Sequence, residues 1–163
     1  MRIGFDLDGV LCDYDDTLTR LLGRLPDDEQ RVSEVNYFSR RRPLLNPTLL
    51  CHGDDEYHVI TGRNQGLRDV TLRWCARHVP GASGVHVVGG RPMYDWPPEE
   101  RGGLDPEFSL KAKRDKILEL GVEVFLDDDP WVVRKLREML PGVAVIQYGG
   151  VLESERPPRE EHG

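Results

Sequence analysis

The chain begins with MRIGFDLDGVLCD, residues 1–13, which combines a strand pattern with two carboxylates. Apolar residues alternate with Arg2 and Gly4 over the first five positions, which predicts a short buried strand. Asp6 and Asp8 follow at once, one residue apart, so both side chains face the same way. Ligands bind at the carboxyl ends of strands in open α/β sheets. The stretch therefore predicts a site that binds a metal or handles a phosphoryl group.

The bulk composition favours one soluble globular domain. The chain has 163 residues, of which 38% are hydrophobic, and a net charge of -7. That charge disfavours nonspecific binding of nucleic acid, but it allows a small phosphorylated substrate, because a local cation can dominate a site. No apolar window approaches the ~18 residues of a membrane span, and no signal peptide is recognisable, so we expect no membrane association. A cytoplasmic location is favoured by three cysteines without metal-binding spacing: Cys12, Cys51 and Cys75.

Strands and helices alternate along most of the chain. Further strands are predicted at 56–60, 85–88, 122–126 and 143–146, and helices at 14–23, 67–78, 111–120 and 131–140. Asn64 is the expected cap of the second helix, and Trp74 on that helix is expected in the core. This alternation predicts an α/β fold, a three-layer Rossmann-like parallel sheet with helices on both faces.

Two stretches carry little pattern. Residues 29–55 are predicted to be irregular, with one or two helical turns and a short helix near 47–51. Residues 91–110 form a long loop rich in Pro, Gly and charge, and loops of that length are typically functional or disordered. We expect one domain over residues 1–148 with a small cap insertion at about 11–55, followed by a charged, flexible tail at 149–163.

Polar clusters follow three of the predicted strands. They are Asp6 with Asp8, the triplet 61–63 (TGR) and the triplet 127–129 (DDD). If these strands are neighbours, all three clusters meet at one edge of the sheet. Carboxylate and hydroxyl oxygens on a rigid rim suit Mg²⁺, which takes one or two carboxylates together with substrate phosphate.

The order of these motifs resembles the haloacid dehalogenase (HAD) superfamily of phosphohydrolases. The shared features are DLDGV, a strand ending in ITGR, a lysine, and a strand ending in LDDD, spread over residues 1–148. The resemblance implies a HAD-like fold, Mg²⁺ as cofactor, and hydrolysis of a phosphomonoester through an aspartyl-phosphate.

The resemblance also implies roles for individual residues. Asp6 matches the nucleophile, and Asp8 matches the general acid and base, whose backbone carbonyl faces the metal. Thr61 and the Gly62 amide match the groups that bind the transferring phosphoryl group. Arg63 directly follows them, and it either contacts substrate or pairs with a nearby carboxylate.

Two assignments keep alternatives. Asp128 matches the residue that completes the Mg²⁺ site with Asp6, although the metal contact lies among three neighbours: Asp127, Asp128 and Asp129. The lysine that stabilises phosphoryl charge has three candidates: Lys111, Lys113 and Lys116. In the related nucleotidases this lysine lies about two helical turns before the glycine that ends the helix, here Gly121, and that spacing favours Lys113.

The substrate is suggested by finer resemblance. The LDDDP ending and the pattern TGRxxxLRxxTxxW look most like the 5'(3')-deoxyribonucleotidase type, so a nucleoside monophosphate is the first choice. The segment PLLNPTLL also resembles the phosphatase half of polynucleotide kinase, which makes a nucleic-acid 3' end the alternative. A regulatory or phosphate-binding module without turnover is a third hypothesis, but every catalytic motif is present. A mutase would need a larger lid than this insertion.

Overall fold

A computed structural model describes residues 1–149 and contains a five-stranded sheet in which every strand runs parallel. The strand order is β3-β2-β1-β4-β5, which puts the N-terminal strand at the centre. The parallel α/β sheet is therefore confirmed. The strands are β1 Arg2–Phe5, β2 Glu56–Thr61, β3 Gly84–Val87, β4 Val124–Asp127 and β5 Ala144–Gln147. Except for Gly149, the predicted tail at 149–163 lies outside the described residues.

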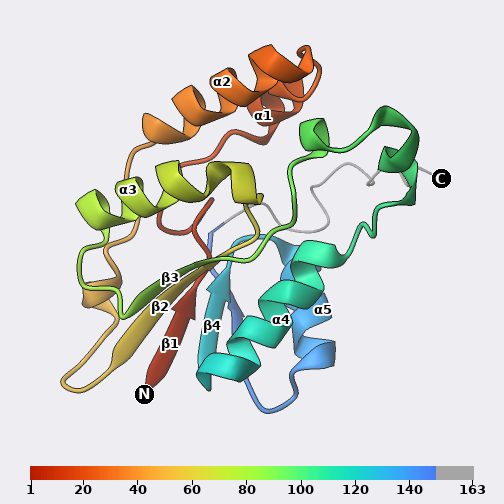
Figure 1. Cartoon of the computed structure of the whole chain (residues 1–163). Coiled ribbons are helices and arrows are strands. Elements are labelled where there is room, and N and C mark those ends of the chain that lie inside the picture. The colour runs from red at the N-terminus through yellow and green to blue at the C-terminus, as the bar shows by residue number, and fades with distance from the viewer. Residues whose placement is uncertain (150–163) are drawn as a thin grey trace.

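Helices cover both faces of the sheet, as Figure 1 shows. On one face α3 (Arg68–His78) packs Trp74 and Cys75 against the sheet. On the other face α4 (Phe108–Leu120) and α5 (Pro130–Met139) share a second core with Phe125. Trp74 is thus a core residue, as predicted. No helix within residues 1–149 is long and apolar enough to cross a bilayer.

The register of the strands brings the polar clusters to one edge. Phe5 pairs with Val59 on one side and with Leu126 on the other. The amide of Asp6 then donates to the carbonyl of Leu126 at 2.8 Å, which continues the ladder by one residue. The residues that directly follow β1, β2 and β4 consequently meet at the carboxyl edge, where open α/β sheets bind ligands.

The cap insertion is more helical than its sequence suggested. It contains α1 (Asp16–Leu22), α2 (Asp27–Ser39) and a 3₁₀ turn, η1 (Pro47–Leu49). The prediction of irregular structure over 29–55 was wrong for α2. This helix was missed because it buries only two residues, Tyr37 and Phe38, both near its C-terminal end. A helix with so small an apolar face shows little periodicity. Its signal was instead the proline at position 26 followed by three acidic residues in the first turn.

The long loop is partly ordered and lies against the cap. It contains two 3₁₀ turns, η3 (Met93–Asp95) and η4 (Pro98–Gly103). Arg31 of α2 pairs with Asp95 at 2.6 Å, and its guanidinium lies 5.0 Å from the ring centre of Tyr94. Arg101 pairs with Asp27 at 3.0 Å. The cap and this loop are therefore joined beside the carboxyl edge of the sheet.

A histidine pair between β2 and β3 makes stability depend on pH. His58 Nδ1 and His86 Nε2 lie 3.3 Å apart, and burial lowers the pKa of both rings below the usual value, aided at His86 by the neighbouring His58. Protonation is thus weaker in the folded chain than in the unfolded one. The pair's contribution is complete above about pH 6.5, the unfolded pKa, and is lost as pH falls.

We expect His86→Gln to flatten the fall in unfolding free energy between pH 7 and pH 5. Urea unfolding followed by circular dichroism at each pH measures this slope. His52→Gln, which changes an exposed histidine outside the pair, is the matched control. A slope in the His86 variant equal to that of the control would rule out the pair as the source.

Candidate active site

Four buried polar side chains come together at the carboxyl edge. Asp6 directly follows β1, Thr61 ends β2, Asp127 ends β4, and Lys113 reaches in from the middle of α4. All are less than 10% exposed, with Thr61 and Asp127 at 1%. The parallel sheet thus gathers residues that lie more than 100 positions apart in the chain.

Lys113 is the lysine that reaches the predicted nucleophile. Its Nζ lies 3.2 Å from Asp6 Oδ1 and 2.7 Å from Asp127 Oδ2. The other two candidates point elsewhere, because Lys111 pairs with an aspartate in the preceding loop and Lys116 pairs with a glutamate on its own helix. Position on α4 therefore separates three lysines that spacing alone left open.

Three carboxylates lie close together beside Lys113. Asp6, Asp127 and Asp128 each offer an oxygen, and the three oxygens lie within 4.8 Å of one another. Burial and then the charge of Asp127 raise the pKa of Asp6 well above its usual value, and the same two causes raise the pKa of Asp128 to about 7. A single ammonium leaves this group with excess negative charge. Hard oxygen ligands with unbalanced negative charge fit Mg²⁺.

The three consecutive aspartates face different neighbours. Asp129 caps α5, where its side chain accepts hydrogen bonds from two backbone amides. Asp127 is bound to Lys113 and to the Asp129 amide. Asp128 lies against Gly9, where an added Cβ would overlap the Asp128 carboxylate. Gly9 also has φ of +85°, so the turn after β1 needs glycine twice over.

The Asp8 carboxylate pairs with Arg63 and is not among the three clustered carboxylates. Its two oxygens accept hydrogen bonds from Arg63, at 2.6 Å from Nη2 and 2.9 Å from Nε. The Arg63 side chain is 2% exposed, donates also to the Thr71 hydroxyl at 3.0 Å, and stacks 4.1 Å from the ring centre of Phe38. Of the two alternatives for Arg63, pairing with a carboxylate is the one observed. The carboxylate of Asp8 is correspondingly outside the potential metal group, and the predicted contact through its backbone carbonyl stays a prediction.

The loop predicted to bind phosphate, residues 61–63 and here called the phosphate loop, is held from both sides. The Thr61 hydroxyl accepts from the Arg63 amide at 3.3 Å, and the Gly62 carbonyl accepts from the Ser109 hydroxyl at 3.4 Å. Ser109 lies at the start of α4, the helix that carries Lys113. Helix α4 therefore both carries Lys113 and, through Ser109, holds the loop predicted to bind the phosphoryl group.

No site role was predicted for two exposed aromatic side chains near the site, Tyr14 and Phe108. Tyr14 is 41% exposed, and the charge of Asp8 contributes, after burial, to a raised pKa of its phenol. Phe108 is 51% exposed and lies next to Gly90 and one residue before Ser109. The helix predicted at 14–23 is observed as α1, which has no buried residue.

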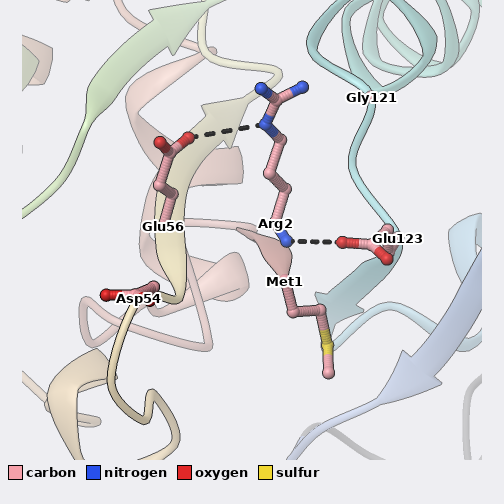
Figure 2. A pocket seen from close by; sticks show the side chains of 6 residues that line it. All are labelled: Met1, Arg2, Asp54, Glu56, Gly121 and Glu123. Atoms are coloured by element: carbon pink, nitrogen blue, oxygen red, sulfur yellow. Dashed lines mark hydrogen bonds and ion pairs between the residues drawn. The ribbon is translucent and has the colours of Figure 1, made fainter.

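A pocket at the opposite edge of the sheet is structural. Figure 2 shows Arg2 donating from its backbone to Glu123 at 2.8 Å and pairing through its side chain with Glu56 at 3.4 Å. The N-terminal ammonium of Met1 pairs with Asp55 at 2.9 Å nearby. These contacts anchor the start of β1, and none of the predicted site residues lines this pocket.

The buried pair of Arg63 and Asp8 yields a stability prediction. Arg63→Met removes the guanidinium and leaves the Asp8 carboxylate, 18% exposed, without its partner. We expect the free energy of unfolding to fall by about 3 kcal/mol. Arg63→Lys keeps the charge but loses the planar, stacked fork, so it should fall in between. Urea unfolding measures both variants. A loss no larger than that of Arg42→Met, at an arginine whose side chain is 86% exposed, would refute the structural role.

Comparisons with known proteins support the fold. No protein-family model matches the sequence, and a search of curated proteins found no match. Among solved structures, the chain is similar to one from the Pnkp1/Rnl/Hen1 RNA repair complex, with a TM-score of 0.58 and 19% identity, covering 93% of this chain and 43% of that one. A second structure of the Pnkp1/Rnl/Hen1 complex matches 93% of this chain and 47% of its own. The chain thus spans less than half the length of each of these two solved chains.

Two neighbours match over nearly their whole length. One is a HAD-superfamily hydrolase of subfamily IA, variant 1, from Geobacter sulfurreducens PCA, with a TM-score of 0.51, 14% identity, and coverage of 93% and 90%. The other is a hydrolase from Streptococcus pneumoniae TIGR4, with a TM-score of 0.50, 8% identity, and coverage of 92% and 93%. The chain therefore has the fold of the HAD-superfamily hydrolases.

Proposed function

We propose that the chain is an Mg²⁺-dependent phosphomonoester hydrolase that acts through an aspartyl-phosphate on Asp6. The observation that carries the proposal is the buried cluster in which Lys113 contacts Asp6 and Asp127 while Asp128 lies alongside. A purely structural role would not explain this concentration of buried charge, because buried carboxylates without enough counter-charge destabilise the fold. A site for a dianionic phosphoryl group and its cation does need it.

In the first step Asp6 attacks phosphorus. A carboxylate oxygen of Asp6 forms a bond to phosphorus while the ester bond to the leaving oxygen breaks, and Asp8 gives that oxygen a proton. The Lys113 ammonium, the Thr61 hydroxyl and the Gly62 amide stabilise the charge on the transferring oxygens. Because both oxygens of Asp8 are bound to Arg63, this role requires Asp8 to turn at least one oxygen toward the substrate.

In the second step water releases phosphate. Asp8 takes a proton from the water, whose oxygen bonds to phosphorus as the bond to the Asp6 carboxylate breaks. The products are inorganic phosphate and regenerated Asp6. One residue thus serves as acid and then as base, which splits one difficult displacement into two easier ones.

Asp6, Asp128 and the Asp8 backbone carbonyl would hold the Mg²⁺ ion, with Asp127 as a further candidate. A bound Mg²⁺ screens the Asp6 carboxylate from the incoming phosphate and neutralises charge on the phosphoryl oxygens. The fit rests on the close oxygens of the three carboxylates and on their excess negative charge.

A nucleoside monophosphate is the substrate we favour. Exposed Tyr14 and Phe108 beside the site offer apolar ring surface to a nucleobase, which a sugar phosphate would not use. The alternative is a polynucleotide with a 3'-phosphate, supported by the similarity to a chain of an RNA repair complex. A phosphate-binding module without turnover would explain the fold but gives no reason for the complete set of catalytic motifs.

Asp6→Asn should abolish hydrolysis of an aryl phosphate. We expect the rate to fall by about 10⁴-fold or more, because no nucleophile remains, while the thermal unfolding curve is retained. Chelation by EDTA should stop the unchanged chain, and added Mg²⁺ should restore it. Phosphate release measures both effects.

The matched control is Asp115→Asn, the same change at an exposed carboxylate on α4. It should leave the rate within about twofold, as expected for a surface substitution. Near-full activity of Asp6→Asn would disprove the nucleophile assignment. Full activity in EDTA would disprove the need for a divalent cation.

A substrate panel tests the leaving group. We expect kcat/KM for nucleoside monophosphates to exceed that for sugar phosphates by about tenfold, and Tyr14→Ala to remove that margin, since base stacking on an aromatic ring contributes about 1–3 kcal/mol. Sugar phosphate hydrolysis should stay within about twofold in the variant. Faster hydrolysis of 3'-phosphorylated oligonucleotides than of every mononucleotide would instead establish the alternative.

A further inference from the structure

Three buried polar atoms between the cap and the long loop have no hydrogen-bond partner among the residues that the structure describes. They are Glu34 Oε2 on α2, Asn64 Oδ1 directly after the phosphate loop, and the Tyr94 hydroxyl in η3. Tyr94 is only 8% exposed. The expected capping bond from Asn64 is not made, which leaves its side-chain oxygen in this group.

The three atoms share one location. A Cβ on Gly66 would stand 2.6 Å from the Tyr94 hydroxyl and 3.0 Å from Asn64 Oδ1, so both atoms lie over the same backbone position. Glu34 follows Arg31 by three residues on α2, so their side chains share a face of that helix, and the Arg31 guanidinium lies 5.0 Å from the Tyr94 ring centre. Glu34 also adds, through its charge and after burial, to the raised pKa of Tyr94. Its other oxygen accepts from Gln30 at 3.0 Å, and Oε2 is left open.

This group adjoins the catalytic centre. Glu34 and Phe38 are four residues apart on α2, so they lie on the same face of that helix. Phe38 stacks on Arg63, which holds Asp8, and Asn64 is the next residue after Arg63. The leaving group of a substrate attached at Asp6 would extend from the phosphate loop toward this part of the cap.

We propose that Glu34, Asn64 and Tyr94 form a subsite for a leaving group that donates hydrogen bonds, through amino or hydroxyl groups. A carboxylate oxygen and an amide oxygen accept only, and the phenol can do either, so the set calls for N–H or O–H donors. Buried acceptors without partners cost stability, and a ligand that supplies the partners removes that cost. The inference rests on the proposed function, because it assigns the leaving group of the same reaction.

Access to the subsite would run between α2 and the long loop, which ends where α4 begins at Phe108. Two partly exposed ion pairs join them, Arg31 with Asp95 and Arg101 with Asp27, and Arg31 also lies over the ring of the buried Tyr94. Exposed ion pairs contribute little to stability. The ion pairs therefore resist separation little, and exposure of the Tyr94 ring is the main cost. Separation opens the three atoms to a ligand while leaving the sheet intact.

The test compares substrates that differ by one donor. Guanosine and inosine monophosphates differ by one amino group, and ribose and deoxyribose forms of one nucleotide differ by one hydroxyl. We expect at least a tenfold difference in kcat/KM within one of these pairs, because a site built for a donor rejects the analogue without it. Tyr94→Phe and Glu34→Gln should reduce that difference to within threefold while aryl phosphate hydrolysis changes by less than twofold.

The control is Glu29→Gln, the same change in the first turn of α2, which should keep the discrimination. Equal rates within both pairs, or variants that change only the melting temperature, as for an ordered water bound there, would overturn the inference. Calorimetric binding of the free nucleosides to the Asp6→Asn chain gives a reading independent of turnover. Discrimination there without any hydrolysis by the unchanged chain would support the subsite and reject the proposed function.

Discussion

The contact on which the site depends is that of the Lys113 ammonium with Asp6 and Asp127. All three groups are buried, so each charge requires the others. The burial of α4 against the sheet sets where this ammonium lies, because Leu110 and Ile117 on either side of Lys113 are core residues. The packing of one helix therefore determines the electrostatics at the ends of two strands. A shift of α4 along the sheet would move Lys113 away from Asp6 and Asp127. The two carboxylates would then be buried without a counter-charge, because water does not reach them.

A second chain of contacts joins the cap to the core. Phe38 of α2 stacks on Arg63, and Arg63 binds both oxygens of Asp8. Arginine suits this position because its planar group can stack on a ring and form two parallel hydrogen bonds at once. The position of the cap and the orientation of Asp8 are thus physically linked. In the proposed reaction, a movement of α2 would be felt at the group that transfers the proton.

Much of this arrangement was predictable because the information is local. A strand followed by carboxylates puts them at the sheet edge whatever the rest of the chain does, which is why Asp6, Thr61 and the 127–129 triplet were found. Helix spacing favoured Lys113 over Lys111 and Lys116, but its contacts with Asp6 and Asp127 arise from the packing of α4 and could not be predicted. The helix α2 was missed because it buries so little. Glu34 and Tyr94 could not be paired from sequence, since they meet only when the cap lies on the long loop.

The anchoring of β1 at its amino end has a practical side. The ammonium of Met1 is itself a partner in an ion pair with Asp55, beside the contacts of Arg2 in Figure 2. A peptide fused ahead of Met1 would convert that cation into a neutral amide and leave Asp55 without it. Asp6 directly follows this strand, five residues after Met1. An affinity handle fused at Met1 would therefore change the charge balance at the amino end of the strand that leads to Asp6.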